Sequence, residues 1–151
     1  MTSILLVEDE KHKREELIDC LTTFYGNDLS LFTVDGLREA VLKVSRENFD
    51  LIILDMALPI FPEKGEGGER GHDQALGGVE VLRALRSKGV IAKIIIVTQY
   101  SEVNVNGKNV KLQVASGLLS RKYKQKIIGS LLYKYRSEMN KPKLTSLLKK
   151  I

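Results

Sequence analysis

Apolar residues along the chain alternate between two spacings. Short runs of consecutive apolar residues, such as 51–54 (LIIL) and 94–97 (IIIV), are typical of strands buried on both faces. Between these runs, apolar residues recur three or four positions apart, which is the spacing of one helix face. The pattern predicts strands at 3–7, 29–34, 50–54 and 92–97, and helices at 10–25, 36–47 and 79–88.

The last third of the chain gives weaker signals. Residues 101–116 should hold a fourth helix, but the segment 104–109 (NVNGKN) has the composition of a turn. A short fifth strand is predicted at 117–120, and a fifth helix at 123–139. The apolar residues of this helix that we expect to face the core are Ile127, Ile128, Leu131, Leu132 and Tyr135.

Strands and helices therefore alternate along the chain. Such alternation predicts an α/β fold, in which five parallel strands form a doubly wound sheet with helices on both faces. We expect one domain at residues 1–140, with a long glycine-rich insert at about 60–77 after the third strand. Residues 141–151 are then a basic C-terminal extension.

Composition narrows the class of protein. No apolar run approaches the roughly 18 residues that a membrane-spanning helix needs. The first residues have no basic region ahead of their apolar stretch, so we expect no signal peptide. Cys20 is the only cysteine, which excludes an internal disulfide and is typical of a reducing compartment. We therefore expect a cytoplasmic protein.

Charge is distributed unevenly. The formal net charge is +5, but residues 121–151 hold ten Lys or Arg and a single acid, Glu138. Lysines and leucines share the segment 141–151, which could form a short amphipathic helix that contacts a partner protein, nucleic acid or an anionic membrane. A solvated extension of the fifth helix is the simpler interpretation. Because no recognition-helix motif is present, we do not expect a nucleic-acid partner.

Polar side chains follow four of the five predicted strands. Parallel strands have their carboxyl ends at one edge of the sheet, so these side chains should meet there. Acids gathered in this way repel one another, and a divalent cation relieves the repulsion. Carboxylate oxygens and water are ligands that Mg²⁺ prefers, so the sequence predicts a magnesium site with a basic side chain beside it. The side chains concerned are Glu8, Asp9, Asp55, Thr98, Arg121 and Lys122.

A carboxylate in such a site can take part in only a few kinds of reaction. An ionised Asp is a nucleophile toward phosphorus and forms an acyl phosphate. Mg²⁺ and a basic side chain stabilise the charge of the transferred phosphoryl group. The hydroxyl of Thr98 could donate a hydrogen bond to a phosphoryl oxygen. Phosphoryl transfer to Asp55 is therefore the predicted reaction.

The chain resembles the receiver domains of bacterial two-component response regulators from residue 3 to about residue 138. The resemblance is carried by ILLVEDE at 4–10, VDGLREAVLKVSRENFDLIILDMALP at 34–59 and IIIVTQY at 94–100, in this order and spacing. It implies a flavodoxin-like sheet with strand order 2-1-3-4-5. It also implies a phosphoryl donor, a histidine kinase or phosphotransfer protein, and a surface whose binding to a downstream protein is switched by phosphorylation.

The resemblance assigns roles to individual residues. Asp55 is similar to the phosphoacceptor, Asp9 to the direct Mg²⁺ ligand, and Glu8 to the acid that holds the metal through water. The backbone carbonyl of Ala57 is similar to a further metal ligand, and Thr98 to the switch hydroxyl. Such a domain is not a dedicated enzyme. A dimer, if formed, would use the face of the fourth helix, fifth strand and fifth helix.

Several positions depart from the family pattern. The Gly that opens the third helix comes late, at Gly78, because of the insert. The usual Lys-Pro after the fifth strand is absent. Residue identity favours Lys122 as the phosphate-contacting cation, whereas the preceding pair of leucines favours Arg121. The aromatic residue usual in that strand is also missing, and Gln99 replaces the usual small residue after Thr98.

These departures leave a second interpretation open, a degenerate receiver that binds its partner without phosphorylation. Two other α/β classes fit less well. Both a haloacid-dehalogenase-like phosphatase and a topoisomerase-primase-like metal fold expect a second Asp two residues after the first, where this chain has Ala57.

Overall fold

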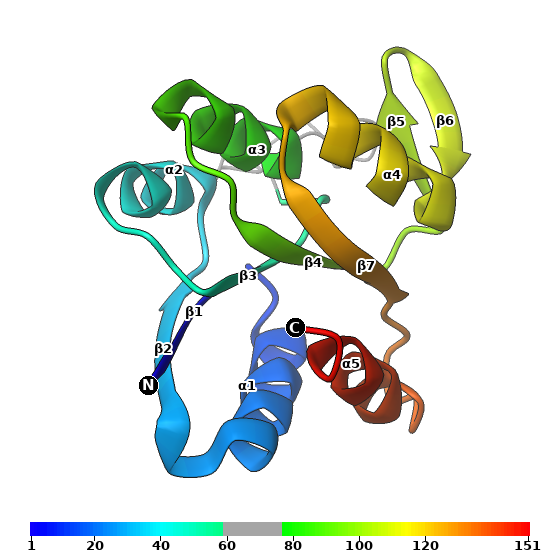
Figure 1. Ribbon diagram of the computed structural model, residues 1–151. Helices are drawn as coiled ribbons and strands as arrows, with labels where there is room; N and C mark the ends of the chain where they lie inside the picture. Colours follow the sequence, from blue (N-terminus) through cyan, green and yellow to red (C-terminus); the bar gives the residue numbers. More distant parts are fainter. Residues whose placement is uncertain (59–76) are drawn as a thin grey trace, which may run out of the picture.

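The computed structural model describes residues 1–58 and 77–151, in which a parallel sheet lies between two layers of helices (Figure 1). All neighbouring strands of the sheet are parallel, and their order is β2-β1-β3-β4-β7. The predicted doubly wound, five-stranded parallel sheet is therefore confirmed. All but the last residue of the insert predicted at about 60–77 lies outside the described residues. The strands are β1 (Thr2–Val7), β2 (Leu29–Val34), β3 (Leu51–Leu54), β4 (Lys93–Thr98) and β7 (Lys126–Leu132).

Helices cover both faces of the sheet. One face carries α1 and α5, and the other carries α2, α3 and α4 (Figure 1). In the two described ranges, none of the helices has the length and apolar character of a membrane span. The helices are α1 (Lys11–Tyr25), the short 3-10 turn η1 (Gly26–Asp28), α2 (Leu37–Arg46), α3 (Gly77–Lys88), α4 (Leu112–Tyr123) and α5 (Asn140–Leu148).

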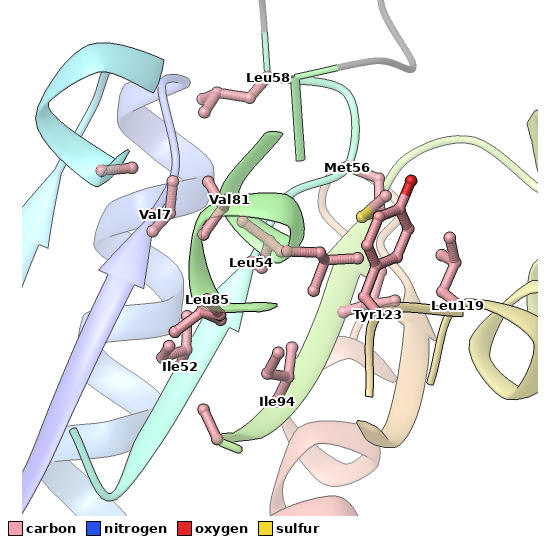
Figure 2. Packing of buried hydrophobic residues seen from close by; sticks show 14 of the residues in the cluster. Val7, Ile52, Leu54, Met56, Leu58, Val81, Leu85, Ile94, Leu119 and Tyr123 are labelled. Carbon is pink, nitrogen blue, oxygen red and sulfur yellow. The ribbon is translucent and has the colours of Figure 1, made fainter. Parts of the chain in front are cut away.

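The core consists of one apolar layer on each face of the sheet. Because side chains alternate along a strand, Leu5 and Val7 of β1 point toward α2 and α3, whereas Ile4 and Leu6 point toward α1. Strand β3 is likewise buried on both faces, as its apolar run predicts. Figure 2 shows the layer under α3 and α4, with Val7, Ile52, Leu54 and Ile94 of the sheet near Val81, Leu85, Leu119 and Tyr123 of the helices.

The last strand and last helix lie elsewhere than predicted. Residues 117–120, expected as the fifth strand, belong to α4. Residues 126–132, expected inside the fifth helix, form β7 instead. Their apolar residues are spaced so that they fit one face of a helix as well as a strand, so periodicity alone could not decide between the two. Tyr135, expected in the core, lies beyond the strand and is 59% exposed.

Residues 141–151 contain most of α5, so they are part of the fold and not an extension beyond it. Leu144 and Leu148 are buried in the layer shared with α1. The helix also approaches β7 closely, because a Cβ added to Gly129 would lie 2.6 Å from Leu147 Cδ2. Burial against the sheet therefore explains the leucines of this segment.

A β-hairpin stands between β4 and α4, where the predicted helix at 101–116 should have begun. Its strands β5 (Glu102–Val105) and β6 (Lys108–Lys111) pair antiparallel. Asn106 and Gly107 form the turn with φ angles of 55° and 85°, the left-handed conformation that two-residue Asn-Gly turns adopt. Two valines of β5 are buried against α4, so the hairpin is packed onto that helix.

Helix α3 begins at a glycine pair that packs against the loop after β3. A Cβ added to Gly78 would lie 2.7 Å from Met56 Cα and 2.9 Å from Asp55 O. These atoms belong to the backbone, which cannot rotate away as a side chain can. Gly78 N also donates a hydrogen bond to Met56 O over 3.3 Å. The position expected of Gly78, at the start of the third helix, therefore agrees with the structure.

We expect Gly78→Ala to lower the free energy of unfolding by about 1–3 kcal/mol, because the new Cβ must displace the backbone after β3. Urea unfolding followed by far-UV circular dichroism measures the change. Gly117→Ala in α4 is the matched control, since its Cβ would meet only Arg121 Nη1, at 3.8 Å. That control should gain about 0.5–1 kcal/mol from helix propensity. Unchanged stability of Gly78→Ala would contradict the close approach of α3 to Asp55.

Candidate functional site

Three carboxylates meet at the carboxyl ends of two neighbouring strands. Glu8 and Asp9 follow β1, and Asp55 follows β3. One oxygen from each side chain can be chosen so that the three atoms all lie within 4.8 Å of one another. Glu8 and Asp55 are buried, whereas Asp9 is exposed to solvent. The predicted convergence of these acids is therefore confirmed.

Hydrogen bonds at the strand ends hold the acids in place. Asp55 N donates to Val7 O over 3.2 Å, which continues the pairing of β1 with β3. Glu8 N donates to Val34 O over 3.1 Å at the end of β2. The side chain of Asp55 is fixed as well, because Ala57 N donates to its Oδ1 over 2.9 Å. The sheet itself therefore sets the positions of Glu8 and Asp55.

A lysine of α1 lies among the acids. Lys13 is 0% exposed, and its Nζ lies 2.8 Å from Glu8 Oε1 and 3.5 Å from Asp55 Oδ2. Nζ also donates a hydrogen bond over 3.1 Å to Val97 O of β4. The sequence pattern had not singled out this residue. A usable signal was present, because Lys13 precedes the buried Leu17 by one helical turn and so lies on the buried face of α1.

Burial makes the ionised acids costly, as their pKa values show. Burial, and then the charge of Asp55, raises the pKa of Glu8 to about 8, although Lys13 opposes the rise. Partial desolvation of its carboxyl group, and then the charge of Asp55, also raises the pKa of Asp9, although the residue as a whole is exposed. When all three acids are ionised, the single ammonium of Lys13 leaves an excess of two negative charges in the cluster. A divalent cation would balance that excess.

The donor set of the cluster fits Mg²⁺. A few carboxylate oxygens with room for water are the surroundings that this ion takes in proteins. Both oxygens of Glu8 already accept hydrogen bonds, Oε1 from Lys13 and Oε2 from Glu10 N over 3.1 Å. Glu8 is therefore suited to hold a metal through water. Asp9, which is exposed, is open to a hydrated ion.

Thr98 ends β4, which is the neighbour of β3 in the sheet. It is buried, and its Oγ1 accepts a hydrogen bond from Tyr100 N over 3.4 Å. Beside it, Gln99 Nε2 donates to Glu10 Oε1 over 3.0 Å, which joins the loop after β4 to the loop that carries the acids. A hydroxyl is therefore present at the edge of the sheet where the acids gather.

Arg121 and Lys122, predicted as cations beside the acids, lie in the last turn of α4. Because α4 leads into β7, this turn lies near the amino ends of the strands, opposite the acids. There, Arg86 Nη1 of α3 donates to Lys122 O over 2.8 Å. Lys122 Nζ donates to Asn106 Oδ1 in the hairpin turn. The prediction is wrong because residues 117–120 belong to α4, so Arg121 and Lys122 do not follow the last strand.

Tyr133 and Lys134 follow the true last strand, β7. Tyr133 turns toward α1, where its hydroxyl donates to Glu16 Oε1 over 2.6 Å. Burial, and then this hydrogen bond, raises the pKa of Tyr133. Lys134 is exposed, and none of the ion pairs among the described residues includes it. Asn140 holds the backbone of Lys134 on both sides, with hydrogen bonds of 3.1 Å to its N and 2.7 Å to its O.

Solved structures similar to this one include receiver domains. The response regulator TrrA of Thermotoga maritima, in complex with Mg²⁺ and BeF, is 26% identical, with a TM-score of 0.59 over 97% of this chain and 99% of that one. The receiver domain of a Pseudomonas aeruginosa sensor histidine kinase, with magnesium in its active-site cleft, is 19% identical, with a TM-score of 0.59 over 99% and 97%. No family model matches the chain. The fold and the acidic cluster together define a receiver domain.

Two similar proteins identify the family. The Detocs response regulatory protein DtcB of Vibrio alginolyticus is 32% identical over 123 residues, which are 80% of this chain and 80% of that protein. The protein of the same name from Enterobacter cloacae is 28% identical over 151 residues, which are 98% of this chain and 97% of that protein. The chain belongs to the DtcB family of response regulators, which confirms the resemblance found in the sequence.

We expect Mg²⁺ to stabilise the protein against urea, because only the folded chain brings the three acids together. At free Mg²⁺ about 100 times its dissociation constant, the free energy of unfolding should rise by about 2.7 kcal/mol. Asp9→Asn should lose most of this gain. Glu10→Gln, the adjacent acid outside the cluster, is the control and should keep it. An equal gain in Asp9→Asn and the wild type would rule out Asp9 as a ligand.

Proposed function

We propose that the protein is a cytoplasmic response regulator that accepts a phosphoryl group on Asp55, with Mg²⁺, from the phosphohistidine of a histidine kinase or phosphotransfer protein. The observation that carries this proposal is the cluster of Glu8, Asp9 and Asp55 with Lys13 in its midst. Membership of the DtcB family supports it, since a response regulator of a two-component system has a kinase as its partner. The protein acts as a signalling switch and not as a dedicated enzyme.

Asp55 Oδ2 is the oxygen suited to attack phosphorus, because Oδ1 accepts the hydrogen bond from Ala57 N. Attack forms an O–P bond and breaks the P–N bond of the phosphohistidine, whose electron pair returns to the imidazole. A proton on the other ring nitrogen lets the imidazole leave as a neutral base. Water later attacks the same phosphorus, releases inorganic phosphate and restores the carboxylate.

The remaining residues of the site assist this transfer. Asp9, Asp55 and the carbonyl of Ala57 would hold Mg²⁺ directly, and Glu8 would hold it through water. The bound ion would supply positive charge to the phosphoryl oxygens. The hydroxyl of Thr98 donates a hydrogen bond to one of these oxygens. To form this hydrogen bond, Thr98 moves toward the phosphoryl group. Because Thr98 ends β4, which pairs with β7, this movement changes the surface formed by α4, β7 and α5. We propose this surface as the binding site of the downstream partner or of a second copy.

A degenerate receiver, which binds its partner without phosphorylation, is the second candidate. The ion pairs of Lys13 with Glu8 and Asp55 favour it, because they stabilise part of the buried negative charge without metal or phosphate. The two candidates differ in one chemical outcome, since only the phosphoacceptor forms an acyl phosphate.

We expect acetyl phosphate with Mg²⁺ to add one phosphoryl group to the wild type, seen as the corresponding gain in intact mass. Asp55→Asn should take up none, because an amide is not a nucleophile toward phosphorus. Asp35→Asn is the matched control: Asp35 is exposed and follows β2 at the same edge of the sheet, so this variant should be labelled normally. Chelation of Mg²⁺ should prevent labelling of both the wild type and Asp35→Asn.

A wild type that stays unlabelled by acetyl phosphate, and also by a phosphorylated histidine kinase of its own system, would contradict the phosphoacceptor function. The degenerate receiver would then be the better description. Labelling of Asp55→Asn at the rate of the wild type would instead place the phosphoryl group on another residue.

A further inference from the structure

We propose that Lys13, on the first helix, is the cation that contacts the phosphoryl group on Asp55. In the receiver domains that the sequence resembles, this cation is a lysine that follows the last strand. The inference rests on the proposed function, because it assigns a role in the same site. The family pattern assigns no role to Lys13 of α1.

Not every N–H donor of the Lys13 ammonium group has a partner at hydrogen-bond distance. An ammonium group has three N–H donors. One donates to Glu8 Oε1 at 2.8 Å and another to Val97 O at 3.1 Å, both ordinary hydrogen-bond lengths. The contact with Asp55 Oδ2, at 3.5 Å, is longer than a good hydrogen bond. The third donor therefore faces the oxygen that would carry the phosphoryl group and is free to bind a phosphoryl oxygen.

The ammonium of Lys13 is held in place before any phosphoryl group arrives. Glu8 and Val97 bind it from β1 and β4, on either side of the strand that carries Asp55. The ring of Tyr133, which follows β7, lies 5.6 Å from Nζ, within the range of a cation–π contact. A cation fixed and shielded from water in this way stabilises charge that develops beside it without having to reorganise.

The basic residues after β7 and on α4 are poorly placed for the same task. Lys134 is exposed, and Asn140 fixes its backbone. Tyr133, one residue earlier, points toward α1, where its hydroxyl donates a hydrogen bond to Glu16. Arg121 and Lys122 lie in the last turn of α4, near the opposite edge of the sheet. Among the described residues, Lys13 alone forms an ion pair with Asp55.

The test compares rates of labelling by acetyl phosphate in saturating Mg²⁺. Lys13→Met removes the charge and keeps much of the length, and should slow labelling by about 10- to 100-fold, the loss expected for a hydrogen bond to a charged group. Lys13→Arg keeps the charge with another geometry and should restore part of the rate. Lys134→Met is the matched control, a lysine-to-methionine change at the family's usual position, and should label at the wild-type rate.

Two further measurements separate a phosphoryl contact from a structural role. Urea unfolding and Mg²⁺ titration of each variant show whether fold and metal binding persist. In the wild type, NMR of ¹⁵N-labelled lysine ammonium groups should show the Lys13 signal, identified by its loss in Lys13→Arg, shifting when beryllofluoride is added to the Mg²⁺-bound protein. The signal of Lys134 should not shift. This measurement remains decisive if Lys13→Met fails to fold.

The outcomes distinguish this inference from the function on which it rests. If the wild type is labelled and Lys13→Met is labelled equally fast, Lys13 is not the cation and the phosphoacceptor function stands. If Lys134→Met is the slow variant, the cation follows the last strand as in the family. If the wild type neither takes up label nor responds to beryllofluoride, the phosphoacceptor function fails, and the role of Lys13 fails with it.

Discussion

The buried ammonium of Lys13 is what allows two carboxylates to lie inside this fold. An isolated charge in a protein interior costs several kcal/mol, and removing one partner of a buried ion pair typically costs about 3–5 kcal/mol. Glu8 and Asp55 are each almost fully buried, and Lys13 is the basic group within reach of both. The pairing of β1 with β3, which brings the acids together, and the docking of α1, which brings the lysine, therefore depend on one another.

Both helical layers touch the site, which links its chemistry to the outer surface. From one side, α1 supplies Lys13, and the ring of Tyr133, just after β7, lies next to it. From the other side, α3 packs its first glycines against the backbone on either side of Met56. Elements on both faces of the sheet therefore lie close to Asp55, so a change in its charge acts on both. A receiver needs such contact if phosphorylation is to alter a binding surface.

The three acids of the cluster lie where the family pattern predicts, whereas the basic side chain beside them does not come from the end of the last strand. The acids follow the same strands as in other receivers, because the order of a parallel sheet fixes which strand ends are neighbours. A cation has more freedom, since a long flexible side chain can reach the same point from several elements. Here the residues after β7 are held by Asn140 and Glu16, and the first helix offers a lysine from its buried face.

The sequence alone determined the parallel sheet, the placement of Glu8, Asp9 and Asp55 at its edge, and Gly78 at the start of α3. These features depend on local signals: apolar runs that end in acids, and a glycine that lets two backbone segments meet. Tertiary structure alone decided that 126–132 is a strand and that Lys13 pairs with Glu8 and Asp55. The spacing of Ile127, Ile128, Leu131 and Leu132 satisfies a helix face and a strand alike, so only pairing with β4 resolves it. A lysine on a helix is ordinarily solvated, and only acids brought from two distant strands give its charge a partner in the core.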